Sequence, residues 1–204
     1  TTSSSESSPV SGTIDPIERP EPSPAVPALP LSTPSLRLRR LVRSDAPRLL
    51  LLNAEPSTRR WLPSHVYVDR AAADAAVRFL VAAYDSPGDP RLGPYVLAVD
   101  DRRSGELLGH VGFSPLDDEV EVSFALAESA RGRGLGVEAL RHGGAWVAGA
   151  FGLQDIVAVT ETVNAASRRT LARAGFAHEG DESRRFQGGM ALVSCYRWHR
   201  LPPP

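Results

Sequence analysis

The chain has 204 residues, of which 42% are hydrophobic and 23% charged, enough for one globular domain with a sizeable core. Its formal net charge of -1 argues against a nucleic-acid partner. All 23 basic residues are arginine, which excludes mechanisms that need a lysine, such as Schiff-base formation. We expect no membrane span, because no apolar run of roughly 18 residues or more occurs. The single cysteine, Cys195, cannot form an internal disulfide, so we expect a cytoplasmic protein. The sequence has no Cys/His spacing typical of a zinc site, so we expect no metal.

The first 35 residues differ in amino-acid composition from the rest of the chain. They hold eight of the 18 prolines, many Ser and Thr, and no aromatic residue. Such a segment buries too little apolar surface to offset the entropy of ordering it. We therefore predict a disordered tail over residues 1–35, one folded domain over 36–200 and a short tail over 201–204.

The first half of the domain begins with an alternating pattern that predicts a strand at 36–39. Ser44 and the proline at position 47 predict the start of a helix that ends near residue 53. Asp69 predicts the N-cap of a second helix over 70–84. Three strands follow, at 95–99, 106–113 and 120–127, and their short separations make them antiparallel neighbours.

The second half alternates helices and strands. Periodicity predicts a helix over 134–151 that ends at Gly152, then an apolar strand at 155–160, which together form a parallel crossover. Asn164 opens another helix, which Gly175 closes. Two strands, 177–184 and 191–198, complete the chain. The predicted fold is α/β of the α+β type, with a mixed, mainly antiparallel sheet of about seven strands and a central βαβ unit.

A glycine-rich loop precedes the helix at 134–151. It reads Arg131-Gly132-Arg133-Gly134-Leu135-Gly136. A helix start leaves backbone N–H groups unpaired and carries about half a positive charge, and glycines let phosphate oxygens approach the backbone. A P-loop would need Gly-Lys-Ser/Thr. A dinucleotide-binding turn should follow its strand directly, whereas residues 128–133 intervene here.

The loop's Arg-x-x-Gly-x-Gly spacing, after a strand and opening a helix, resembles the acetyl-CoA motif of the GNAT N-acetyltransferases. Further segments are similar to the ribosomal-protein-alanine acetyltransferase-like subfamily of these enzymes, and together the likeness covers about residues 36–200. These segments are Arg60–Pro63, Glu121–Leu126, Gly136–Leu140, Asn164–Ser167 and Ala174–Phe176.

The resemblance implies transfer of an acetyl group from acetyl-CoA to a primary amine by direct attack in a ternary complex. The acceptor would be a protein N-terminus or a small-molecule amine, with neither a nucleic acid nor a membrane as partner. The oligomeric state stays open, a homodimer included. The cofactor-binding residues implied are Phe124, Ala125, Leu126, Arg131, Gly132, Arg133, Gly134, Leu135, Gly136 and Asn164.

Two catalytic roles follow from the same resemblance. Glu121 is the candidate general base, with Glu119 and His110 as rivals. Alternation puts Glu119 on the same face of the strand as Glu121, so the pattern does not separate these two glutamates. Ser167 is the candidate acid that protonates the leaving thiolate, or else only part of the helix N-terminus. Asn164 either caps that helix or contacts the pantetheine arm.

Two departures from the subfamily concern the acceptor end. Ser123 stands where the subfamily often has glycine, and the last strand lacks an aspartate often found there. Two other functions remain open: a non-catalytic acyl-CoA-binding sensor or interaction domain of the same fold, and a dinucleotide-binding protein, which the loop spacing disfavours.

Overall fold

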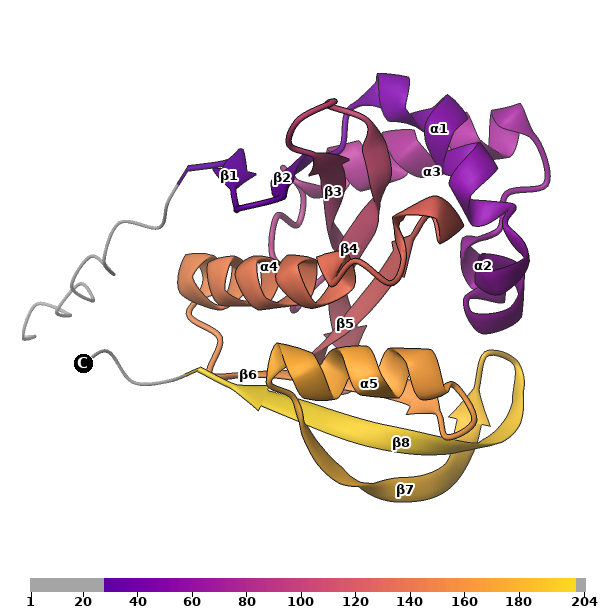
Figure 1. Ribbon diagram of the computed structural model, residues 1–204, viewed down its shortest axis with the longest axis vertical. Helices are drawn as coiled ribbons and strands as arrows, with labels where there is room; N and C mark the ends of the chain where they lie inside the picture. Colours follow the sequence, from indigo (N-terminus) through magenta and orange to yellow (C-terminus); the bar gives the residue numbers. More distant parts are fainter. Residues whose placement is uncertain (1–27, 201–204) are drawn as a thin grey trace, which may run out of the picture.

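The computed structural model describes residues 28–200, which fold around one eight-stranded sheet (Figure 1). The strand order is β1-β2-β3-β4-β5-β6-β8-β7, and every neighbouring pair is antiparallel except β5 and β6. The strands are β1 Leu31–Ser32, β2 Leu36–Arg40, β3 Tyr95–Asp101, β4 Leu107–Leu116, β5 Glu119–Leu126, β6 Asp155–Glu161, β7 Ala177–Phe186 and β8 Gly189–His199. The predicted mixed, mainly antiparallel sheet with one βαβ unit is confirmed.

Helices cover both faces of the sheet. The α-helices are α1 Ala46–Asn53, α2 Pro56–Trp61, α3 Arg70–Ala83, α4 Leu135–Phe151 and α5 Ala165–Ala174. Three short 3₁₀ turns accompany them: η1 Arg43–Asp45, η2 Pro63–His65 and η3 Glu128–Ala130. Helix α4 runs across the strands, and α5 lies beside α4 and contacts β6 and β7 (Figure 1). Helices α1 and α3 pack on the opposite face from α4, against the strand residues that alternate with those under α4.

Local capping signals place the predicted helix ends correctly. The Asp69 carboxylate accepts from the Ala72 N–H, and the Asn164 side chain accepts from the Ser167 N–H. Gly152 and Gly175 end their helices with φ of 67° and 98°, which side chains disfavour. The helix expected from Ser44 instead starts with the 3₁₀ turn η1, and α1 begins at Ala46.

The domain boundary predicted at residue 35 lies too late in the chain. Leu31 pairs with Leu38 in the edge strand β1. Thr33 is buried and donates to the Glu138 carboxylate at 2.5 Å, and the Ser35 N–H donates to the same group at 2.7 Å. Average composition could not reveal this contact with a helix about a hundred residues away. Residues 1–27 of the predicted tail, and the tail predicted over 201–204, lie outside the described residues.

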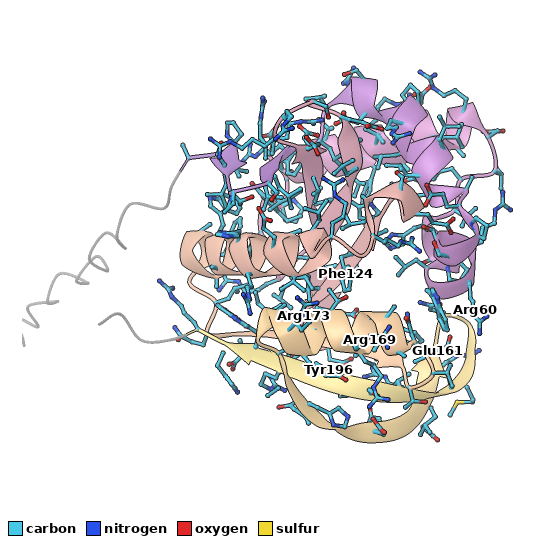
Figure 2. The ribbon with its side chains drawn as sticks, viewed as in Figure 1. Arg60, Phe124, Glu161, Arg169, Arg173 and Tyr196 are labelled. Atoms are coloured by element: carbon cyan, nitrogen blue, oxygen red, sulfur yellow. The ribbon has the colours of Figure 1, made fainter. Side chains whose placement is uncertain are left out.

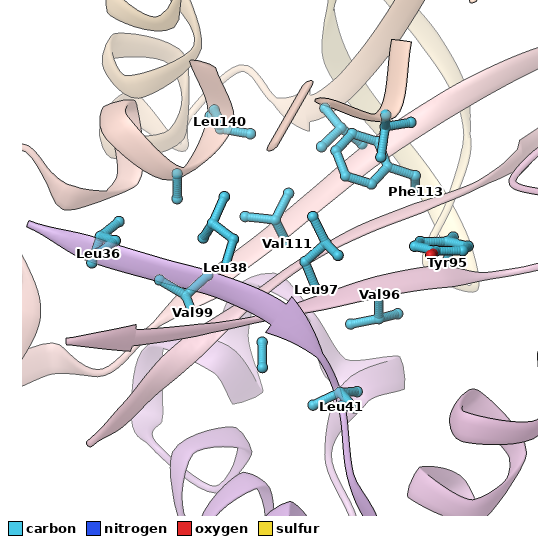
Figure 3. Close-up of a cluster of buried hydrophobic side chains, with 14 of the residues drawn as sticks. Leu36, Leu38, Leu41, Tyr95, Val96, Leu97, Val99, Val111, Phe113 and Leu140 are labelled. Carbon is cyan, nitrogen blue, oxygen red and sulfur yellow. The ribbon is translucent and has the colours of Figure 1, made fainter. Parts of the chain in front are cut away.

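The main core lies between α4 and the central strands (Figure 3). Leu140 of α4 faces the apolar side chains of β2, β3 and β4, which alternate along each strand. The fully buried members include Leu36, Leu38, Leu97, Val99, Val111 and Phe113. This packing fixes α4, and with it the loop before it, on one face of the sheet. Across residues 28–200 no helix is both long and apolar enough to cross a membrane.

Candidate functional site

A cleft of about 530 Å³ opens where β5 and β6 separate. The two parallel strands share a single register pair, Glu121 with Val157, whereas β5 keeps eight pairs with β4 on its other side. Beyond that pair, residues 122–126 of β5 and 158–161 of β6 line opposite walls of the cleft. Alternate backbone groups of β5 point away from β4, so those near Phe124–Leu126 are left to face this space.

The glycine loop forms the end of the cleft beside α4. Gly132 and Gly134 have φ of 74° and 80°, and a Cβ at either position would meet nothing within 4 Å. No described side chain caps α4, so its first N–H groups have no capping partner there. Glu138, the acidic residue of the first turn, is held by Thr33 and Ser35 instead. This end of the cleft is therefore suited to an anion.

The two loop arginines are placed differently, and only Arg131 lines the cleft. Arg131 lines the cleft, but its Nε and Nη2 donate to the Leu126 carbonyl at 3.0 and 2.8 Å, which folds the loop back on β5. Arg133 is not among the residues that line the cleft, and its Nη2 lies 3.8 Å from Asp101. Gly136 lines the cleft and also lies close to α5, since a Cβ there would lie 3.2 Å from Thr170 Cγ2.

Two arginines that the sequence reasoning missed line the cleft instead. Arg169 and Arg173 are four residues apart on α5 and belong to the lining of the cleft (Figure 2). A spacing of four puts two side chains on the same face of a helix, so the signal was present in the sequence. Together they supply positive charge opposite the uncapped start of α4.

Asn164 and Ser167 lie on the same wall, at the start of α5. Asn164 is buried, and its Oδ1 accepts the Ser167 N–H at 3.1 Å, so the capping role holds. Its NH₂ group is left as a donor toward the cleft, which it lines. The Ser167 hydroxyl has no hydrogen bond with any other group of residues 28–200 and also lines the cleft.

Glu121 occupies the point where β5 and β6 begin to diverge. Its side chain is partly buried and lines the cleft. Burial raises the pKa of this carboxyl above its ordinary value, and the charge of Arg184 and a hydrogen bond from the Val159 backbone partly offset that rise. A carboxylate with a raised pKa is a stronger base than an exposed glutamate.

The rival bases are placed differently. Glu119 does not line the cleft. Its carboxylate is paired with Arg197, which also binds Glu179 at 2.7 Å. His110 is buried, does not line the cleft, and has its Nε2 3.2 Å from Nδ1 of His65. Burial, together with the nearby His65, lowers the pKa of His110 to about 3. Of the three candidates, only Glu121 reaches the cleft.

The buried histidine makes stability sensitive to acid. His110 has a folded-state pKa far below 6.5, so as pH falls from 6.5 the unfolded chain takes up a proton that the folded chain refuses. The contribution of His110 to stability is present above pH 6.5 and is lost as pH falls toward 3.

Because of His110, we expect the free energy of unfolding to fall by up to about 1.4 kcal/mol for each unit of decrease in pH. Urea unfolding between pH 7 and 4.5 should show a shallower slope for His110→Gln, whereas the exposed His142→Gln should keep the wild-type slope. Equal slopes in all three proteins would contradict the assignment.

The far wall of the cleft comes from α2 and the β7–β8 hairpin. The Gln187 side chain in the hairpin turn donates to the Trp61 carbonyl at 2.6 Å and ties the two together. The guanidinium of Arg60 stacks on the Trp61 ring, 4.5 Å from its centroid. Figure 2 shows Arg60 on the side of the molecule where β6 ends at Glu161, near this hairpin. The segment Arg60–Pro63, singled out in the sequence, thus borders the cleft.

Comparison with known proteins agrees with this geometry. The family model described as an acetyltransferase (GNAT) domain matches residues 35–177, and the chain belongs to this family. No curated protein matches the chain.

Solved structures show the same fold. An acetyltransferase from Agrobacterium tumefaciens has 25% identity and a TM-score of 0.65, with 83% of this chain and 94% of that chain covered. RimL, a ribosomal α-N-protein acetyltransferase in complex with coenzyme A, has 19% identity and a TM-score of 0.69, with 82% and 95% covered. A ribosomal-protein-S5-alanine acetyltransferase from Vibrio fischeri has 17% identity and a TM-score of 0.68, with 83% and 95% covered. The predicted GNAT membership is confirmed.

Proposed function

We propose that the protein transfers an acetyl group from acetyl-CoA to a primary amine in the cleft between β5 and β6. The observation that carries this proposal is one continuous cleft that joins three parts: the uncapped start of α4, the free Ser167 hydroxyl and the Glu121 carboxylate. The residues present fit coenzyme A. The phosphates have the α4 start and the arginines of α5, and the pantetheine arm has the diverging edges of β5 and β6.

The chemistry needs three groups, and each has a place along the cleft. Glu121 accepts the proton from the attacking amine, directly or through water. Backbone N–H groups of Phe124–Leu126 that point away from β4 stabilise the negative charge that develops on the thioester oxygen. The C–N bond forms first, the C–S bond then breaks, and the Ser167 hydroxyl donates a proton to the leaving thiolate and regains one from solvent.

The acceptor is proposed to be a protein N-terminus or a small amine. Two of the structural neighbours are named for acetylation of ribosomal proteins, which supports a protein amine. An assay of free thiol release together with mass spectrometry of a peptide and amine panel tests the proposal. Acetyl-CoA binding without acetylation of any amine would favour the alternative, a non-catalytic acyl-CoA-binding domain.

A further prediction concerns the α5 arginines. The variant Arg169→Ala/Arg173→Ala is expected to weaken acetyl-CoA binding about 10- to 100-fold, because two charge-assisted contacts to phosphate are lost. Calorimetry at low and high salt measures it, and the salt dependence should be smaller in the variant. Arg168→Ala is the matched control, since Arg168 binds the Tyr196 hydroxyl and the Thr162 carbonyl and does not line the cleft. If the double variant binds as tightly as Arg168→Ala, the phosphates do not lie against α5.

A further inference from the structure

A second cavity of about 230 Å³ opens off the cleft, and we call it the side pocket. It lies between α3, η2 and the strands β3 and β4, on the face of the sheet opposite α4. Four residues line both the side pocket and the cleft and so mark the passage between them. They are Ser64, His65, Ser114 and Ser123.

The strand register puts this passage next to Glu121. Glu121 is paired with Ser114, and Ser123 is paired with Gly112. Paired residues and alternate residues of a strand share a face, so the side chains of Glu121, Ser114 and Ser123 lie on one face of the sheet. Same-face neighbours along a strand are about 7 Å apart. An amine nitrogen beside Glu121 therefore has its own substituents at the mouth of the side pocket.

The lining of the side pocket changes from polar to apolar away from the passage. Serines border the passage, whereas Phe79, Leu80 and Val96 line the part beyond it. A side chain at Gly112 would enter this space, since a Cβ there would lie 3.4 Å from Val96 Cγ2. None of the Asp, Glu or Arg side chains of residues 28–200 lines the pocket.

A histidine pair also lines the side pocket without adding charge. The rings of His65 and His110 stack with centroids 5.3 Å apart, and one ring nitrogen of each faces the other at 3.2 Å. Burial lowers the pKa of both rings, so the pair is neutral at neutral pH. A charged substituent would find no counter-charge here and would lose its hydration.

We propose that the side pocket binds an apolar group carried next to the acceptor's amine, so that the preferred acceptor is a primary amine with an aliphatic or aromatic substituent on the neighbouring carbon. This inference rests on the proposed acetyl transfer. Sites that enclose a whole small-molecule ligand have volumes of roughly 300–1,000 Å³. The side pocket is smaller than these sites, so its volume suits one substituent rather than a whole ligand.

The test compares acceptors that differ only in this substituent. Tripeptides with N-terminal Gly, Leu, Phe, Asp or Arg, and the matching amino-acid amides, are assayed with acetyl-CoA and the full chain. We expect kcat/KM for Leu and Phe to exceed that for Gly by about 10- to 100-fold, as burial of one such side chain allows. Asp and Arg should fall below Gly. The two series distinguish a peptide acceptor from a small amine, because only a peptide-binding site favours the tripeptides.

Variants locate the preference in the side pocket. Ala76 on α3 lines the pocket and its neighbour Ala75 is exposed, so Ala76→Phe should fill the space while Ala75→Phe serves as the matched control. Ala76→Phe is expected to remove the preference for Leu and Phe and to keep the rate with Gly. Phe79→Ala removes a wall of the pocket from a ring that is 62% exposed, and it should reduce the preference even if Ala76→Phe does not fold.

The outcomes separate this inference from the function beneath it. Acetylation with equal kcat/KM for Gly and Leu, or with a preference for Arg or Asp, would overturn the side-pocket assignment and leave acetyl transfer intact. A preference for Leu and Phe that survives both Ala76→Phe and Phe79→Ala would also overturn it. Failure to acetylate any amine in either series would overturn the proposed function, and with it this inference.

Discussion

Replacement of Glu121 by glutamine is expected to lower the rate of acetyl transfer by about 10²- to 10⁴-fold, the usual contribution of a general base. Glutamine has nearly the same shape but cannot take up the proton of the amine. Because Glu121 lies away from the α4 end of the cleft, acetyl-CoA affinity should stay within about twofold of wild type. Steady-state kinetics and calorimetry measure the two effects separately.

The same substitution should make the protein more stable at neutral pH. The folded-state pKa of Glu121 is raised, so its contribution to stability is fully present below the ordinary glutamate pKa and is lost as pH rises through the raised value. Glutamine stays neutral and escapes this loss. Urea unfolding at pH 4 and pH 8 measures this effect. The free energy of unfolding of Glu121→Gln, relative to that of the wild type, should be higher at pH 8 than at pH 4.

Glu119→Gln is the matched control for both effects. It breaks an ion pair with Arg197 outside the cleft and should leave turnover unchanged. The pH–rate profile of wild type should also rise through a pKa above that of an exposed glutamate. Wild-type turnover in Glu121→Gln would remove Glu121 from the mechanism, whatever its effect on stability.

Replacement of Gly109 by alanine is the second change with a large expected effect. A Cβ at Gly109 would lie 2.0 Å from the Ala125 carbonyl oxygen and 2.9 Å from Leu126 Cα, and neither backbone atom can rotate away. One of the two strands must move, at a cost of about 3 kcal/mol. Because the displaced end of β5 is the wall of the cleft, acetyl transfer should fall by about 100-fold as well.

Gly149→Ala is the matched control for this prediction. Gly149 lies in α4, where a Cβ would meet nothing within 4 Å, so alanine should stabilise the protein by up to about 1 kcal/mol. Chemical denaturation gives both free energies, and thiol release gives the rates. A Gly109→Ala variant as stable and active as Gly149→Ala would show that β4 and β5 do not approach as closely as described.

The elements that the sequence predicted are those with local signals. Asp69 and Asn164 accept the backbone N–H groups expected of caps, and Gly152 and Gly175 adopt the left-handed conformation that ends a helix. Alternating or apolar runs bounded by turns located seven strands. Strand β1 and helix α2 were missed because one has two residues and the other six, too few for periodicity to register. Their positions depend on distant contacts.

The candidate site was predicted in outline and not in its side-chain directions. Every predicted site residue except Arg133 lines one cleft. The turn of Arg131 toward the Leu126 carbonyl follows from the loop's three-dimensional path, which no spacing encodes. Likewise, the contact of His65 with His110 joins residues 45 apart in sequence. The roles of the site residues stay predictions until the variants are measured.

The lone register pair between Glu121 and Val157 also describes how the sheet is held together. Five strands on one side and three on the other form two hydrogen-bonded blocks, and within residues 28–200 their ladder is joined at this one place. Unpaired strand edges normally lie at the rim of a sheet, where proteins must protect them from other chains. Here two such edges lie in the interior, facing each other across the cleft. Apart from this one pair, the described strands β5 and β6 therefore lack ladder hydrogen bonds with each other at the centre of the sheet. A bound molecule with amide groups could form hydrogen bonds with both strand edges and so connect the two blocks.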